Sequence, residues 1–163
     1  IFSMNALEHT ENIEQHIYCC INLLKDKNSL LFIQCPNYTF PFEAHFYKWF
    51  IPFFPKFTFK YLRKKRLIKT LGEKKFNNII NFINFDCTYG NIKKIKAPIE
   101  FVNPLIDIFD RLSNDKIFRE RLLTNSAINL TWRLINLLKI KNILIKLFPI
   151  FLCPYLIIKI KKT

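Results

Sequence analysis

The stretch Ser29-Leu30-Leu31-Phe32-Ile33-Gln34-Cys35-Pro36-Asn37 decides the fold, because it is an almost unbroken apolar run that stops at a proline. A strand that is buried on both faces has this pattern. Upstream, residues 11–25 repeat apolar side chains every three or four positions, which predicts an amphipathic helix that follows a cap at Thr10. Residues 1–4 are apolar and predict the end of another buried strand. Strand, helix and strand in this order predict one βαβ unit with parallel strands.

The segment after this unit is rich in aromatic residues and prolines. Residues 38–59 hold eleven aromatic side chains and three prolines, and the prolines exclude a long regular helix. Residues 60–69 are basic and predict a short helix. We therefore expect an irregular lid over residues 38–75, packed against the sheet.

The rest of the chain has a mainly helical pattern. We predict a strand within residues 86–96, helices over 101–146 and a terminal strand around residues 158–161, where Ile and Lys alternate. Only 12 residues separate Lys146 from Lys159, too few for a membrane span of about 20 residues. Residues 1–100 and 101–163 are thus expected to form two parts of one α/β domain, with a helical C-terminal elaboration.

The net charge of +14 is concentrated in two blocks. Residues 48–75 and 116–163 each carry +9, whereas residues 1–47 carry −3. Uniform basicity would favour a nucleic-acid partner, so this pattern makes nucleic acid the least favoured partner. The five cysteines are an odd number without metal-site spacing, which favours reduced thiols in a cytoplasmic protein. The only two glycines exclude a Gly-rich phosphate loop within these residues.

The segment Ser3-Met4-Asn5-Ala6-Leu7-Glu8-His9, the following helix and the strand that ends in Pro36-Asn37 resemble class I S-adenosylmethionine-dependent methyltransferases. The resemblance covers residues 1–46, with weaker agreement at the terminal strand. It implies that the two strands are the fourth and fifth of a seven-stranded Rossmann-like sheet. One departure is the turn after the helix, where Asp26-Lys27-Asn28-Ser29 replaces the usual pair of glycines.

This resemblance implies S-adenosyl-L-methionine as the cofactor and Met4, Asn5 and Leu7 as residues that bind it. A ligand of such a sheet lies at the carboxyl ends of parallel strands, where Met4 and Asn5 are placed. The family's Gly-rich loop and its ribose-binding acid would lie upstream of Ile1. We therefore expect the chain to be the C-terminal part of a methyltransferase domain, and inactive by itself.

Methyl transfer needs an aligned acceptor and, in some reactions, a base. His45 follows the second strand on the acceptor side and is the candidate base, with Asn37, Tyr38 and Glu43 as candidate substrate-binding residues. The competing interpretation is a loop histidine bonded to the backbone.

A divalent metal binds to a Glu-x-x-Glu-His segment in the ubiquinone-type O-methyltransferase branch of the family. In this sequence Asn5 replaces the first glutamate, and Glu8 with His9 alone is a poor metal site, so we expect none.

The aromatic lid beside Arg63-Lys64-Lys65-Arg66 leaves several interpretations open. It is a hydrophobic lid with a solvated basic helix, a pocket for an apolar acceptor, a patch that contacts anionic lipid at the inner membrane face, or, least favoured, a nucleic-acid surface with stacking aromatic rings. The expected partner is therefore a small or lipid-linked acceptor. The alternative is a non-enzymatic membrane-surface or interaction module that uses the aromatic and basic segments.

Overall fold

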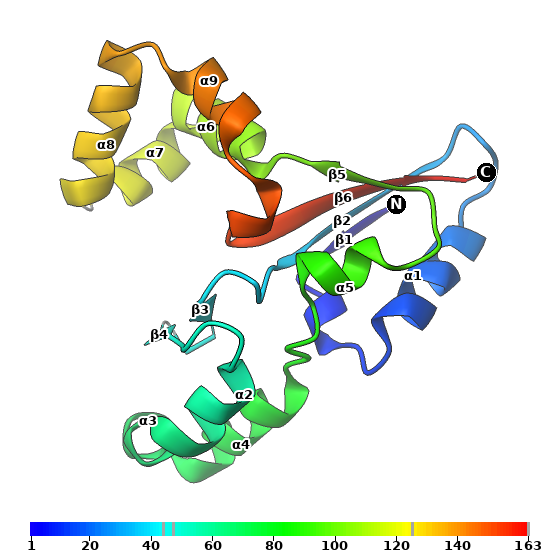
Figure 1. The fold of residues 1–163 in the computed structure, drawn as a ribbon, viewed down its shortest axis with the longest axis vertical. Helices are drawn as coiled ribbons and strands as arrows, with labels where there is room; N and C mark the ends of the chain where they lie inside the picture. The colour runs from blue at the N-terminus through cyan, green and yellow to red at the C-terminus, as the bar shows by residue number, and fades with distance from the viewer. Residues whose placement is uncertain (44, 47, 125, 163) are drawn as a thin grey trace. The chain divides into compact units, whose positions relative to one another are not determined.

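The computed structural model describes residues 1–43, 45–46, 48–124 and 126–162. They divide into two compact units, one of residues 1–102 and 150–163 and the other of residues 103–149. The first unit is a mixed α/β fold with a four-stranded sheet (Figure 1). Tyr47, one of the aromatic residues counted in the lid, lies outside the described residues.

The predicted βαβ unit is confirmed, but the prediction that its first strand is buried is wrong, because Phe2 and Met4 are 79% and 65% exposed. Strand β1 (Phe2–Met4), helix α1 (Ile13–Asn22) and strand β2 (Leu30–Pro36) follow one another, and β1 pairs with β2 in parallel. The predicted cap at Thr10 is wrong, because Asn12 caps α1 by accepting a hydrogen bond from the Gln15 N–H at 2.9 Å. The Thr10 hydroxyl instead donates to the Leu7 carbonyl.

The chain's last strand returns between two earlier ones. Strand β6 (Tyr155–Lys161) pairs antiparallel with β2 on one side and with β5 (Ile99–Val102) on the other, giving the order β1-β2-β6-β5. The terminal strand was predicted and is confirmed. The strand predicted within residues 86–96 is wrong, because this stretch contains helix α5 (Tyr89–Lys93), which Thr88 caps by accepting from the Asn91 N–H.

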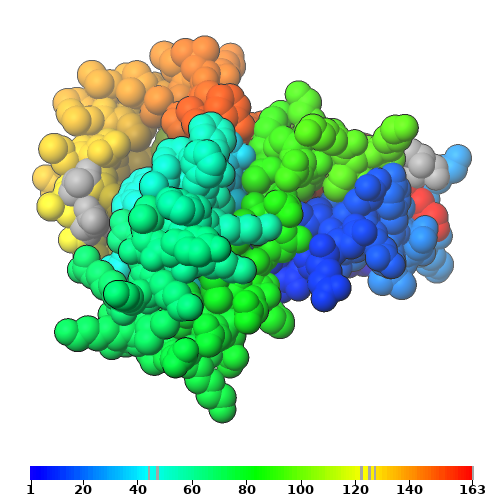
Figure 2. All heavy atoms as spheres, turned by 60° about the horizontal axis from the view of Figure 1, so that its bottom comes forward, coloured from blue at the N-terminus to red at the C-terminus, as the bar shows by residue number. Residues whose placement is uncertain are grey.

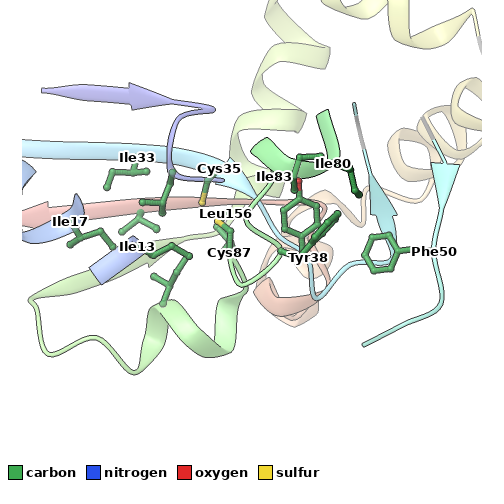
Figure 3. Packing of buried hydrophobic residues seen from close by; sticks show 14 of the residues in the cluster. Ile13, Ile17, Ile33, Cys35, Tyr38, Phe50, Ile80, Ile83, Cys87 and Leu156 are labelled. Atoms are coloured by element: carbon green, nitrogen blue, oxygen red, sulfur yellow. The ribbon is translucent and has the colours of Figure 1, made fainter. Parts of the chain in front are cut away.

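One face of the sheet carries the core. Leu31, Ile33 and Cys35 of β2 are fully buried, and each lies opposite a fully buried residue of β6. Helix α1 covers this face with Ile13 and Ile17, as Figure 3 shows. Because successive strand residues point to opposite faces, the alternating burial of β2 and β6 shows that both strands present the same face to the core.

The lid lies between β2 and α5 and has an aromatic core of its own. Its elements are the hairpin β3 (Phe42–Glu43) and β4 (Lys48–Trp49), α2 (Pro55–Phe57), the π-helical turn η2 (Thr58–Leu62), α3 (Lys64–Leu71) and α4 (Glu73–Phe82). The Phe59 ring lies 5.0 Å from Phe46 and 6.1 Å from Phe85 between ring centres. Buried aromatic rings thus pack the short strands and helices of this segment together.

The second unit is helical, as the sequence predicts for most of its length. It contains α6 (Pro104–Asn114), α7 (Lys116–Leu123), α8 (Ser126–Leu137) and α9 (Lys141–Leu147). Phe109 is buried and lies 5.9 Å from the Trp132 ring. Within the described part of the chain, none of the helices combines the length and the apolar character that crossing a membrane requires.

We predict that Ile158→Val lowers the free energy of unfolding by about 1 kcal/mol, because it removes a buried methylene from the centre of the core face. Ile157→Val is the matched control, since Ile157 is only partly buried and points to the other face. Urea unfolding of both variants measures the difference. An equal loss in the two variants would contradict the assigned core face.

Candidate functional site

Two histidines from distant parts of the chain meet beyond the end of β1. The short 3-10 helix η1 (Leu7–His9) follows β1 and carries Glu8 and His9, while His45 comes from the lid. The ring centres of His9 and His45 lie 5.3 Å apart, and the rings are edge to face. The site therefore combines the segment Asn5–His9 with a residue 36 positions further along the chain.

Glu43 orients His45. The His45 Nδ1 lies 2.6 Å from Glu43 Oε1, and because a carboxylate can only accept, Nδ1 carries the proton. Glu43 is fully buried and also accepts from the Phe46 N–H at 2.6 Å and from the Tyr38 hydroxyl at 3.3 Å. The hydrogen bond to Glu43, together with the negative charges of Glu43 and Glu8, raises the pKa of His45 against the effect of its burial. A neutral His45 thus presents a basic Nε2.

His9 is oriented by the main chain. Its Nδ1 lies 3.2 Å from the carbonyl oxygen of Phe82, the last residue of α4, so this nitrogen is the donor. The same turn is bound to the lid by the Asn84 N–H, which donates to the Glu8 carbonyl at 2.6 Å. Both histidines therefore use Nδ1 for support and leave Nε2 for another partner.

Glu8 is the least satisfied polar group of the site. Its side chain is 1% exposed, and Oε2 has no hydrogen-bond partner among the described residues. Burial raises the pKa of this carboxyl, and the nearby charge of Glu43 acts in the same direction. The nearest basic side chain is His9, whose Nε2 lies 3.8 Å from Glu8 Oε1. A buried carboxyl without a full set of partners is a feature of functional sites more often than of structural ones.

An open pocket of about 600 Å³ reaches the histidines from the surface. His9 and His45 form one side of it, and Asn77, Asn78 and Asn81 of α4 form another. Amide groups beside two imidazoles provide donors and acceptors for a polar acceptor group. A small molecule in this pocket would therefore meet a nitrogen base and several hydrogen-bonding groups.

Glu8, His9 and His45 could also hold a metal ion. One potential ligand atom from each lies within 4.8 Å of the other two. Two imidazoles and a carboxylate suit zinc, manganese or ferrous iron, and the bond from Glu43 to His45 is the kind of support that metal-bound histidines have. The sequence-based expectation of no metal considered Glu8 and His9 alone, since nothing in the spacing of the sequence places His45 beside them.

A second pocket, of about 810 Å³, is lined mainly by aromatic side chains. Phe53, Phe54 and Phe57 of the lid lie on one side, and Phe85 and Tyr89 on the other. Tyr38 links this pocket to the support of His45, because its ring lines the pocket while its hydroxyl donates to Glu43. An apolar group in the second pocket would thus lie against the tyrosine that holds Glu43.

The three predicted cofactor-binding residues lie at and after the carboxyl end of β1. Met4 is 65% exposed, so its side chain is accessible to a ligand. Asn5 has a left-handed backbone with φ of 50°, and its N–H donates to the Gln34 carbonyl. Leu7 is fully buried in the core, so a cofactor could meet only its main chain.

The predicted substrate-binding residues are buried. Tyr38 and Glu43 belong to the hydrogen-bond network of His45, as described above. The Asn37 amide donates to the carbonyls of Phe151 and Cys153, both at 2.9 Å, and its Oδ1 accepts from two N–H groups. Both N–H donors of this side chain are thus used within the protein, which leaves none for a substrate.

Sequence reasoning found His45 and Glu43 but missed the contribution of His9 and the asparagines of α4. From the sequence, His9 was considered only with Glu8, as a poor metal site, and no element was predicted for residues 77–84. The repeat of Asn77, Asn78 and Asn81 within one helical turn was the available signal.

No family model matches the chain, and comparison with curated proteins and with solved structures likewise gives no match.

We predict that Glu8→Gln stabilises the protein at about pH 8 by about 1–2 kcal/mol, because it replaces a buried, poorly satisfied carboxylate by a neutral group. Since the folded-state pKa of Glu8 is raised, its favourable contribution is complete below its ordinary pKa and is lost as the pH rises through the folded-state value. The advantage of the variant should therefore shrink as the pH falls toward 4.5. Urea unfolding at both pH values measures it.

The matched control is Glu14→Gln, an exposed glutamate in the first turn of α1. It should change the free energy of unfolding by less than about 0.5 kcal/mol at either pH. A gain at pH 8 in this control equal to that of Glu8→Gln would show that net charge, and not the buried carboxyl, is responsible.

Asn37→Ala is predicted to lower the free energy of unfolding by about 3 kcal/mol, because it leaves buried main-chain groups without partners. Asn78→Ala on the exposed side of α4 is the control and should have little effect. Chemical denaturation of both variants provides the comparison, and a similar small effect in both would contradict the structural role of Asn37.

Proposed function

We propose that the chain is the C-terminal part of an S-adenosylmethionine-dependent methyltransferase domain, acting on a small or lipid-linked acceptor. The observation that carries this proposal is the position of the His45–Glu43 pair, beside Glu8 and His9, just beyond the carboxyl ends of two adjacent parallel strands. In open α/β sheets this is the place where ligands bind.

The order of the strands supports the finer assignment of the fold. A Rossmann-like methyltransferase sheet ends with a strand that runs antiparallel between the two before it, and β6 has this position between β2 and β5. The helix between β1 and β2 covers one face of the sheet, which is also the arrangement that the resemblance implies. The first unit thus supports the proposal that these are the last strands of a larger Rossmann-like sheet.

The bound cofactor would supply an electrophilic methyl group on a positively charged sulfur. In this chain, Met4 and the main chain of Asn5 are the groups that it would contact, because they lie at the carboxyl end of β1 and the Met4 side chain is accessible. These two groups fit the cofactor by their position at the strand end and by the apolar surface of the Met4 side chain. Leu7 would serve this site only through the backbone turn that it anchors in the core.

His45 would take the proton of the acceptor. Its Nδ1 is held by the hydrogen bond to Glu43, so Nε2 is the nitrogen that would take the proton. Glu43 would then stabilise the imidazolium that forms. His9 and the asparagines of α4 would orient the acceptor in the pocket of about 600 Å³. This division of roles leaves alignment as the main contribution of the enzyme.

The aromatic pocket supports an acceptor with an apolar part. It lies on the other side of Tyr38 and offers a volume of about 810 Å³, enough for a ring system or part of a hydrocarbon chain. A lipid-linked acceptor would place its apolar part there and its reactive group beside His45.

His45→Gln is predicted to lower kcat for methyl transfer by about 100-fold or more, because the base is removed while a hydrogen-bonding side chain remains. The rate is measured with the intact gene product, radiolabelled S-adenosylmethionine and a panel of small and lipid acceptors. Binding of the cofactor, measured by calorimetry, should be unchanged.

His16→Gln is the matched control, since His16 lies on α1 and contacts Cys20 rather than the site. It should retain full activity. Wild-type activity in His45→Gln would remove His45 from the mechanism. Absence of methyl transfer and of cofactor binding in the intact protein would overturn the methyltransferase assignment itself.

A further inference from the structure

The lid exposes an unusual number of large apolar side chains. Phe53 is 83% exposed and Trp49 is 57% exposed. Five further large side chains of the same segment are exposed: Ile51, Phe54, Phe57, Tyr61 and Leu62. We call residues 49–66 the aromatic–basic surface, and Figure 2 shows this segment in cyan and green on the face turned toward the viewer. Contiguous exposed apolar side chains of this kind mark interaction sites.

The backbone holds one of these side chains outward at a cost. Phe53 has a φ of 67°, in the left-handed region that bulky residues avoid because Cβ approaches the carbonyl oxygen. Burial of its ring does not offset this strain, since the ring is mostly exposed. Strained residues persist where a conformation serves a function, and here the conformation presents an aromatic ring to a partner.

The same segment is strongly basic. All six charged residues of the aromatic–basic surface are lysine or arginine. Lys56 pairs with Asp86 at 3.8 Å, and it is the only one of the six with an ion pair among the described residues. The remaining five charges are available to an anionic partner.

The apolar and the basic side chains share one groove. Arg63 and Arg66, at the start of α3, line a groove of about 570 Å³ together with Trp49, Pro52 and Leu62. Two guanidinium groups beside an exposed indole can bind a phosphate while the apolar side chains contact a hydrocarbon layer. The aromatic pocket of about 810 Å³ is lined by Phe53 and Phe54 of the same loop.

We propose that the aromatic–basic surface docks on an anionic phospholipid bilayer. Arg63 and Arg66 bind lipid phosphates, and Trp49 with Phe53 enters the interfacial layer. A nucleic acid is less well matched, because the groove lacks amide side chains for base edges and its apolar side chains include Ile51, Pro52 and Leu62, which do not stack on bases. The inference goes beyond methyl transfer, since bilayer binding needs neither cofactor nor acceptor.

The test uses the whole chain with Trp132→Phe, so that Trp49 is the only tryptophan. Vesicles of phosphatidylcholine with phosphatidylglycerol should shift the Trp49 emission to the blue, and brominated lipid chains should quench it. Vesicles of phosphatidylcholine alone should bind much more weakly, and added salt should release the protein from the anionic vesicles. Free inorganic phosphate and soluble glycerophosphoglycerol should leave the emission unchanged.

Arg63→Gln with Arg66→Gln should weaken binding to anionic vesicles about 30-fold, the change expected for the loss of two interfacial cations. Lys94→Gln with Lys96→Gln removes the same charge outside the groove and should change binding far less. Phe53→Gly, which also relieves the backbone strain, should weaken binding while the protein stays folded by circular dichroism.

Equal losses in the two charge pairs would show a nonspecific effect of net charge and overturn the proposal. Binding without quenching by brominated lipid would overturn the insertion of Trp49. Tighter binding of an RNA oligonucleotide than of anionic vesicles, again lost in Arg63→Gln with Arg66→Gln, would assign the groove to nucleic acid. None of these outcomes depends on whether the intact protein transfers methyl groups.

Discussion

The side chain of Asn37 holds together the three segments that meet at the carboxyl end of β2. Its amide has two donors and an oxygen with two lone pairs, and all four are used. The partners are the carbonyls of Phe151 and Cys153 and the N–H groups of Thr39 and Tyr89. The entry to β6, the beginning of the lid and the start of α5 are therefore fixed by one buried group. It thus adds to the β2–β6 pairing in fixing where the last strand begins.

The position of the histidines follows from this junction. The lid leaves the sheet at Asn37 and returns at Asn84, whose N–H donates to Glu8 and whose amide donates to Thr10. Both ends of the lid are thus bound to the sheet or to the turn after β1. His45 near one end and the Phe82 carbonyl near the other approach His9 from two directions. A segment of short elements and connecting loops can hold a precise site when its two ends are fixed in this way.

Local patterns in the sequence were sufficient for β1, α1, β2 and β6, because each has a burial pattern of its own. They were insufficient where position is set by distant contacts. A strand was predicted within residues 86–96, yet Thr88 caps a helix over Tyr89–Lys93 and the strand begins only at Ile99. The pairing of His9 with His45 leaves no trace in their spacing, because it depends on the path of the whole lid. Asn37 was predicted to bind the substrate because an asparagine at the end of a strand has the same sequence pattern whether it binds a ligand or holds the main chain.

The charge distribution explains why the site uses histidine. The chain has 26 lysine and arginine residues, yet the buried carboxyl groups of Glu8 and Glu43 pair only with the imidazoles of His9 and His45 among the described residues. A lysine or arginine at position 45 would pair with Glu43 permanently and would have no lone pair at neutral pH. An imidazole keeps the pair and can still release or accept a proton on its other nitrogen. Most of the permanent cations lie instead on the lid and on the helical unit.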